Sequence, residues 1–206
     1  MLRKLLIGLC LFTAINASAQ NKVIIPEKTA GVAIDYKQIG APLPELLVIA
    51  YNDTATLKDT TSGKKQTTKK KKKNTPKTYQ PHGKQEHITA STLKSSGNLF
   101  IMMFNPTCGH CDAMATLLEE NIGLFKTTKI LLLANRQMIA YMPEFAGRHH
   151  IQEHPAMYMG TDSSGFIDNV FLYQALPQIN IYNAERKLLK TYAGETPFDS
   201  LRKYIQ

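Results

Sequence analysis

The apolar positions of the chain fall into short blocks that polar segments separate. The clearest block is Leu99–Phe104, six consecutive apolar residues that predict a fully buried central strand. Asn105-Pro106-Thr107 ends this block, and from Asp112 to Phe125 apolar residues recur at helical spacing. A second apolar block at Lys129–Ala134 predicts another strand. The pattern therefore predicts a strand, a helix and a strand in succession.

The remaining apolar positions predict further elements on both sides of this unit. Upstream, the proline-containing segment Gly40–Pro44 leads into an apolar run that predicts a strand, and Ile88–Lys94 predicts a short strand or a helical turn. Downstream, the pattern predicts a helix at Gln137–His150 that Pro143 bends or delays, a strand at Met157–Met159, a helix at Gly165–Gln174, a hairpin of Ile179–Tyr182 and Arg186–Tyr192, and an amphipathic helix at Pro197–Ile205. Strands that alternate with helices predict an α/β fold.

The first 19 residues have the three-part pattern of a secretory signal peptide. Basic residues at positions 3 and 4 precede the apolar run Leu5–Ile15, and Ala17-Ser18-Ala19 supplies small residues for cleavage. The apolar run is about half the length of roughly 20 residues that a membrane-spanning helix needs. We therefore predict removal of residues 1–19 and a periplasmic location. The alternatives are a membrane anchor and lipid attachment at Cys10, although Cys10 lies inside the apolar run.

A lysine-rich segment carries the positive charge of the chain. Ten lysines and one acid between Lys58 and Lys84 give a net charge of +9, which equals the net charge of the whole protein. Because residues at about 54–86 are nearly free of apolar side chains, they predict a disordered insertion in a single domain at 20–206. An anionic lipid surface or an acidic partner would suit this segment, and a solvated spacer is the alternative. No nucleic-acid partner is expected for an exported protein.

The cysteines indicate chemistry rather than a structural disulfide framework. With Cys10 in the signal peptide, Cys108 and Cys111 are the pair that remains, and two residues separate them. A bridge across so short a segment stabilises little. An exported chain with one close pair therefore favours a redox role for the pair.

Two kinds of metal site are alternatives for the cysteines and the histidines. A C-x-x-C pair can be half of a zinc site, but the chain has no second pair, and no histidine follows Cys111 at the distance that a zinc finger requires. A soft-metal patch could be built from His149, His150, His154, Met157 and Met159. Such a run is more often a solvated helix end that leads into a core strand, so no metal is expected.

The position of the cysteines predicts different roles for them. Cys108 lies at or just before the start of the predicted helix, where unpaired N–H groups stabilise a thiolate. His110 adds a positive charge or an N–H donor nearby. Cys111 lies further into the helix and is expected to be a buried thiol. Cys108 would attack a substrate disulfide and Cys111 would resolve the mixed disulfide, with no cofactor beyond the redox-active Cys108–Cys111 bond.

Three parts of the chain together resemble the thioredoxin superfamily. They are the segment Phe100–Cys111, the helix that follows it, and Leu176-Pro177 before the hairpin. Gly40–Pro44 is similar to the start of the exported TlpA/ResA-like branch. The resemblance implies a three-layer sandwich in which helices flank a central mixed β-sheet. It also implies that the lysine-rich segment interrupts the hairpin before the central strand.

The same resemblance assigns a substrate-binding surface around the cysteines. Pro177 would be the cis-proline that faces them, and the backbone of Leu176 would pair with an extended substrate. Thr107 and Gly109 would contribute to the same surface. The tetrapeptide Cys-Gly-His-Cys at 108–111 is also that of protein disulfide isomerases, which implies a more oxidising couple than that of thioredoxin.

The chain departs from the family pattern at two positions beside the cysteines. Thr107 stands where the family usually has tryptophan, and the chain contains no tryptophan. Met102 stands where thioredoxins carry a buried aspartate, so the group that accepts the proton of Cys111 is open. A peroxiredoxin-like activity is disfavoured because Pro106, Thr107 and Cys108 are contiguous, whereas that family spaces them.

These observations favour a thiol–disulfide oxidoreductase that acts on exported proteins with disulfides or thiols. Reduction of periplasmic disulfides, with electrons from a membrane donor, is the preferred direction; oxidation and isomerisation are alternatives. The second hypothesis is a redox-inactive binding module that kept the thioredoxin fold.

Overall fold

The computed structural model describes residues 33–51 and 87–206, and of these, residues 34–51 and 87–206 belong to one compact unit. The predicted signal peptide at 1–19 and the lysine-rich insertion at about 54–86 lie outside the described residues. Among the helices of the described residues, none is long and apolar enough to cross a bilayer.

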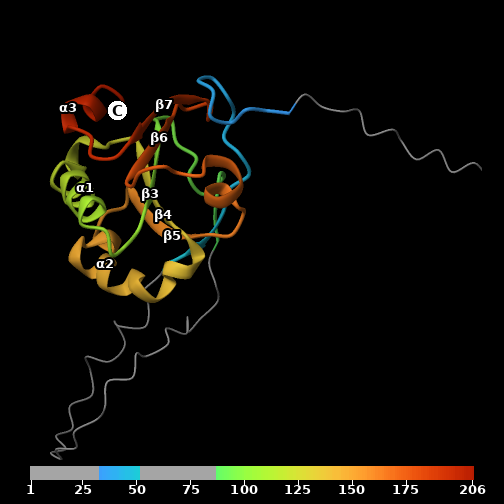
Figure 1. Ribbon diagram of the computed structural model, residues 1–206. Coiled ribbons are helices and arrows are strands. Elements are labelled where there is room, and N and C mark those ends of the chain that lie inside the picture. Colours follow the sequence, from blue (N-terminus) through green and yellow to red (C-terminus); the bar gives the residue numbers. More distant parts are fainter. Residues whose placement is uncertain (1–32, 52–86) are drawn as a thin grey trace, which may run out of the picture. The chain divides into compact units, whose positions relative to one another are not determined.

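The described unit is built on a seven-stranded mixed sheet with the strand order β2-β1-β5-β4-β3-β6-β7. The strands are β1 (Leu47–Ala50), β2 (His87–Thr89), β3 (Leu99–Phe104), β4 (Lys129–Ala134), β5 (Met157–Asp162), β6 (Gln178–Tyr182) and β7 (Leu188–Ala193). The central strands β3, β4 and β5 run parallel, and the neighbours on both sides pair antiparallel. Figure 1 shows these three strands between the helices.

Helices cover both faces of the sheet, which confirms the predicted three-layer α/β fold. They are α1 (Gly109–Glu120), α2 (Met142–Arg148), α3 (Phe198–Arg202), the 3-10 turns Ile122–Leu124, Arg136–Tyr141 and Ile151–Glu153, and a π-helical turn, Phe166–Phe171. In Figure 1, α1 and α2 lie on one side of the strands, and the orange helical turn at 166–171 lies on the other.

The core explains why β3 reads as an unbroken apolar run. All six residues of β3 are buried, and successive side chains point to opposite faces. Phe100, Met102 and Phe104 belong to the cluster that packs under α1 and α2. Leu99, Ile101 and Met103 belong to the cluster on the other face, with Phe166 and Phe171. The central strand is therefore apolar on both faces, as a strand covered by helices on both sides must be.

The helices on the α1 side differ from the predicted boundaries. The helix expected at 112–125 begins at Gly109 and ends at Glu120, where a 3-10 turn follows. The helix expected at 137–150 is divided into the turn Arg136–Tyr141 and α2. Pro143 lies in the first turn of α2, where its missing N–H breaks no helical hydrogen bond, so of the two predicted effects the proline delays the helix and does not bend it.

Three further elements differ in length. The helix expected at 165–174 is the π-helical turn Phe166–Phe171, and the C-terminal helix extends only over Phe198–Arg202. The strand expected at 157–159 continues to Asp162, because β1 pairs with its second half. The Asp162 carboxylate accepts N–H bonds from Ser164 and Ile167 (2.9 and 2.8 Å), which ends the strand and begins the turn.

The strands β1 and β2 pair antiparallel, with Val48 opposite Ile88. The chain between them contains the lysine-rich segment, which therefore connects the two strands of a hairpin, as the thioredoxin resemblance implies. Its attachment points lie on β2 and β1, at one end of the strand order.

Candidate active site

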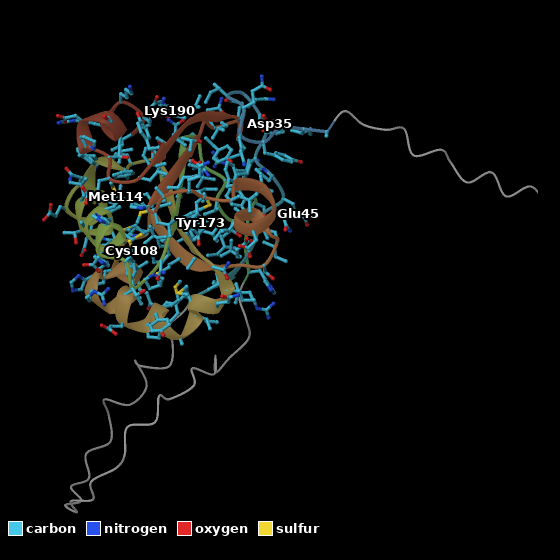
Figure 2. The ribbon with its side chains drawn as sticks, in the orientation of Figure 1. Asp35, Glu45, Cys108, Met114, Tyr173 and Lys190 are labelled. Atoms are coloured by element: carbon cyan, nitrogen blue, oxygen red, sulfur yellow. The ribbon has the colours of Figure 1, made fainter. Side chains whose placement is uncertain are left out.

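The two cysteines lie at the junction between β3 and α1. Cys108 is the N-cap of α1 with extended backbone dihedrals (φ −94°, ψ 120°), and its N–H donates to the carbonyl of Asn105 at 3.0 Å. The Asn105 side chain also accepts bonds from the N–H and the hydroxyl of Thr107, both at 2.9 Å. Local hydrogen bonds therefore hold the short loop that presents Cys108 at the start of α1 (Figure 2).

The cysteines are free thiols in different environments. Cys108 is half-buried, whereas Cys111, one turn further along α1, is fully buried. Burial raises the pKa of Cys111 from an ordinary value of 9.0 to about 12. A hydrogen bond with the Asn105 backbone opposes this shift, and the Cys108 side chain and the Asp112 carboxylate add to it. The buried thiol therefore stays protonated at neutral pH.

The raised pKa of Cys111 predicts a loss of stability in base. Because the unfolded chain gives up the Cys111 proton near pH 9.0 and the folded chain near 12, the unfolded state binds fewer protons between these values and gains stability as the pH rises. From about pH 8 to about pH 10 the dithiol protein should lose roughly 1.4 kcal/mol more unfolding free energy than Cys111→Ala does. Urea unfolding under reducing conditions measures the difference, and parallel losses in the two proteins would contradict it.

The peptide bond between Leu176 and Pro177 is cis. Pro177 is buried and directly precedes β6, which pairs with β3 at Gln178 opposite Met103. The register therefore places Pro177 beside the end of β3 that leads to the cysteines. Within the described residues, the N–H and carbonyl of Leu176 make no backbone hydrogen bond.

Two pockets flank the Cys-Gly-His-Cys segment. One, of about 300 Å³, is lined by Pro106, Thr107, Cys108, Gly109, Asp112, Tyr141, Glu144 and Arg148. The other, of about 470 Å³, is lined by His110, Ala113, Met114, Leu117, Glu195, Thr196 and Pro197. The structure thus brings Thr107, Cys108 and Gly109 together at one pocket and places His110 at the other.

His110 contacts a partner that the sequence did not indicate. Its Nδ1 atom pairs with the carboxylate of Glu195, which lies between β7 and α3. Both side chains are exposed, at 69% and 67%. The contact orients the imidazole at the rim of the site.

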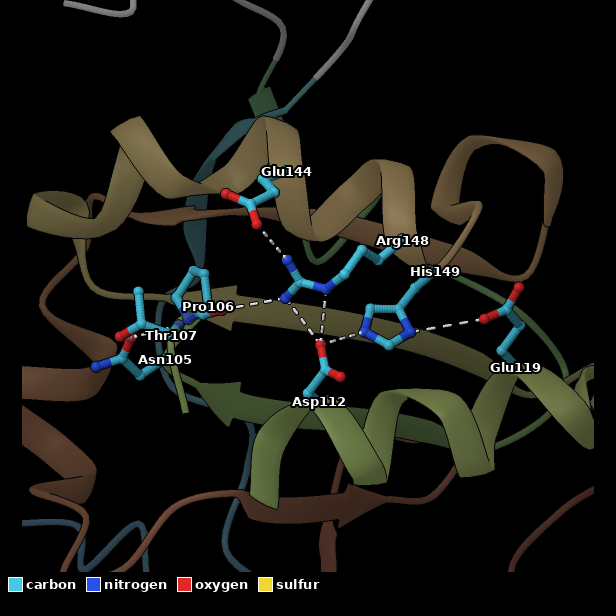
Figure 3. Close-up of polar contacts among 8 residues, drawn as sticks. All are labelled: Asn105, Pro106, Thr107, Asp112, Glu119, Glu144, Arg148 and His149. Atoms are coloured by element: carbon cyan, nitrogen blue, oxygen red, sulfur yellow. Dashed lines mark hydrogen bonds and ion pairs between the residues drawn. The ribbon is translucent and has the colours of Figure 1, made fainter. Parts of the chain in front are cut away.

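A second set of contacts that the sequence did not indicate is centred on Asp112, in the first turn of α1 (Figure 3). Arg148, the last residue of α2, donates to Asp112 Oδ1 from Nε (3.0 Å) and Nη2 (2.8 Å). His149 is buried, and its Nε2 lies 2.9 Å from the same oxygen. The hydrogen bond from Arg148, and then the one from His149, holds the pKa of Asp112 below its usual range. These residues lie 36 and 37 positions from Asp112 in the chain, so no local pattern could have paired them.

The histidines considered for a soft-metal patch surround a carboxylate instead. Glu119 at the end of α1 lies 3.6 Å from His149 Nδ1, 2.8 Å from His150 Nδ1 and 3.7 Å from His154 Nε2. Within residues 33–51 and 87–206, no three His, Cys, Asp or Glu side chains form a group that could hold a metal ion.

Comparison with known proteins identifies the fold. No protein-family model matches the chain, and no curated protein sequence matches it. Among solved structures, a protein assigned as thiol:disulfide interchange protein DsbE from Chlorobium tepidum is 12% identical, with a TM-score of 0.54 over 81% of this chain and 94% of that one. A protein assigned as a protein disulfide isomerase from Bacteroides thetaiotaomicron is 14% identical, with a TM-score of 0.54 over 84% and 91%. The thioredoxin domain of a thiol-disulfide oxidoreductase from Bacteroides vulgatus is 11% identical, with a TM-score of 0.51 over 82% and 99%. The chain has a thioredoxin fold.

The buried surroundings of Cys111 in this thioredoxin fold are apolar. Met102 is fully buried and belongs to the same cluster as Cys111. The one buried carboxylate among the described residues is Asp162, which hydrogen-bonds Ile167 on the opposite face of the sheet. Within the part of the chain that the structure describes, no buried acid therefore lies beside Cys111.

Proposed function

We propose that the protein is an exported thiol–disulfide oxidoreductase in which Cys108 is the nucleophile and Cys111 the resolving cysteine. The observation that carries this proposal is the contrast between the two thiols. Cys108 is accessible at the N-cap of α1 and lines a pocket, whereas Cys111 is buried one turn behind it. Such a pair can attack an external disulfide with one sulfur and close internally with the other.

The reaction consists of two exchanges. The Cys108 thiolate attacks one sulfur of the substrate disulfide, and the other substrate sulfur leaves as a thiolate that takes up a proton. Cys111 then loses its proton and attacks Cys108, which releases the second substrate thiol. The substrate gains two electrons and the protein becomes the Cys108–Cys111 disulfide, with no further cofactor.

Substrate binding in this proposal uses the surfaces on both sides of the cysteines. Leu176 offers its backbone to an extended polypeptide, beside Pro177. Thr107 and Gly109 line the pocket that contains Cys108, and the His110–Glu195 pair borders the other pocket. Partner proteins with disulfides or thiols would bind across this face.

Export is supported by the basic, apolar and small-residue pattern of residues 1–19. The proposed direction in the periplasm is reduction, with a membrane donor that restores the dithiol, since the exported branch that the chain resembles works in this way. Oxidation and isomerisation are the alternatives that Cys-Gly-His-Cys suggests. For the lysine-rich segment we propose an anionic lipid surface or an acidic partner.

Insulin reduction by dithiothreitol tests the proposed activity. The competing function is a redox-inactive binding module, which the apolar residue Met102 suggests. The wild-type protein should accelerate insulin precipitation well above dithiothreitol alone, and Cys108→Ser/Cys111→Ser should not. Equal rates for the two proteins would favour the binding module. The equilibrium of the Cys108–Cys111 pair with glutathione buffers then gives the reduction potential and the direction.

A further inference from the structure

One guanidinium contacts both flanks of the Cys-Gly-His-Cys segment. Arg148 Nη2 lies 3.4 Å from the carbonyl of Pro106, two residues before Cys108. The same nitrogen and Nε donate to Oδ1 of Asp112, the residue directly after Cys111. Figure 3 shows Arg148 between the loop that precedes the motif and the helix that follows it.

Arg148 and the neighbouring His149 each lie between two carboxylates. The Arg148 Nη1 atom donates to Glu144, which is 81% exposed, at 3.1 Å. His149 lies between Asp112 Oδ1 (2.9 Å) and Glu119 Oε2 (3.6 Å). The Asp112 carboxylate therefore has Arg148 and His149 as its partners. Arg148 and Asp112 are each 40% exposed, so solvent screens their pairing only in part.

Asp112 has a particular effect on the resolving cysteine. Burial is the main cause of the raised pKa of Cys111, and the Asp112 charge adds a smaller contribution, because a carboxylate on the neighbouring residue disfavours a second negative charge. Arg148 donates two hydrogen bonds to that carboxylate, and a positive charge at this place would oppose the repulsion. Proton loss from Cys111 is the difficult step of resolution, because the surrounding cluster is apolar. A group that neutralises Asp112 therefore acts on this step.

We propose that Arg148 is a positioning residue of the resolving step: it compensates the Asp112 carboxylate beside Cys111 and holds the Pro106 loop, so that Cys111 can attack Cys108. The proposal rests on the proposed function, since it concerns the second exchange of that reaction. Cys108 reacts first, and Arg148 does not contact its sulfur in any hydrogen bond of the described residues.

The test separates the two exchanges in the full chain. Reduced protein is mixed with 4,4′-dithiodipyridine, an uncharged disulfide that Arg148 cannot attract by its charge. The first thiopyridone is released when Cys108 attacks, at a rate that depends on the probe concentration. The second is released when Cys111 attacks Cys108, at a rate that does not. The variants are Arg148→Gln, Arg148→Lys, Asp112→Asn and the double variant Arg148→Gln/Asp112→Asn, with exposed Arg136→Gln as the matched control.

In Arg148→Gln the second phase should slow by about fivefold, a change of less than one pKa unit, and its pH–rate profile should move to higher pH. Arg148→Lys should restore part of the rate. The second phase of Asp112→Asn should be at least as fast as that of wild type. The second phase of the double variant should be faster than that of Arg148→Gln, because the double variant has no carboxylate at position 112 whose charge Arg148 would have to compensate. Arg136→Gln should behave as wild type.

Other results would overturn the proposal. If the rate of the second thiopyridone release is unchanged in Arg148→Gln, Arg148 has no role in resolution. If the double variant is as slow as Arg148→Gln, the effect of Arg148 is structural and does not act through the Asp112 charge. If Arg148→Gln does not fold, Asp112→Asn tests the same charge, and a slower second phase there would contradict the proposal. A wild-type protein that shows no two-phase release at all would instead overturn the proposed function.

Discussion

Replacing Cys108 by serine is expected to abolish insulin reduction, to the rate of dithiothreitol alone. Cys108 is the accessible thiol of the pair and lines the pocket beside α1, whereas Cys111 is fully buried. A serine hydroxyl at the same N-cap is not a nucleophile toward disulfides at neutral pH, because the reacting species must be a thiolate. Turbidity of reduced insulin measures the loss.

Replacing Cys111 by serine is expected to give the complementary result. Cys108 still attacks a substrate disulfide, but no second thiol can release the product, so mixed disulfides accumulate. They should be visible as bands on a non-reducing gel of the native host and should vanish with reductant. If Cys108→Ser trapped partners and Cys111→Ser did not, the two roles would be reversed.

Met102→Asp is expected to lower the unfolding free energy by about 3–5 kcal/mol at neutral pH, since it places a carboxylate without a partner in the apolar core. Met102 is fully buried and packs in the apolar cluster under α1. Burial would raise the pKa of the new carboxyl, so the destabilisation should decrease as the pH falls and the group becomes neutral. Urea unfolding at several pH values measures this.

The matched control is Met103→Asp, at the next position of β3. Met103 is equally buried but belongs to the cluster on the other face of the sheet, away from Cys111. Both variants should lose similar stability, whereas the new carboxylate can take up the Cys111 proton only at Met102. Faster release of the second thiopyridone in Met102→Asp, and not in Met103→Asp, would support this proton route. Equal rates in the two variants would argue against it.

Much of the candidate site could be predicted from local sequence. The apolar run Leu99–Phe104, the break that follows it and the helical spacing after Cys111 place the cysteine pair at a strand-to-helix junction, as the structure has it. These signals are local, since burial on both faces of a strand or on one face of a helix is repeated along adjacent residues.

The element ends were predicted less well. The turn Phe166–Phe171 and the five-residue helix α3 were expected to be longer helices. Their apolar residues, such as Phe166 and Leu201, are buried by contacts with the sheet and not by long helical faces. The spacing of apolar residues along the chain identifies which residues are buried. It does not define the residue at which the backbone hydrogen bonds of a helix end.

The sequence by itself determined the α/β order, the paired cysteines and the cis-proline position that the thioredoxin resemblance implied. Only the tertiary structure decided which charged groups surround that pair. Glu195 reaches His110 across 85 positions and Arg148 reaches Asp112 across 36. Periodicity and spacing act over a few residues, whereas these contacts exist because packing brings α2 and the β7–α3 connection beside the start of α1. The polar partners of the cysteine pair are therefore a property of the fold.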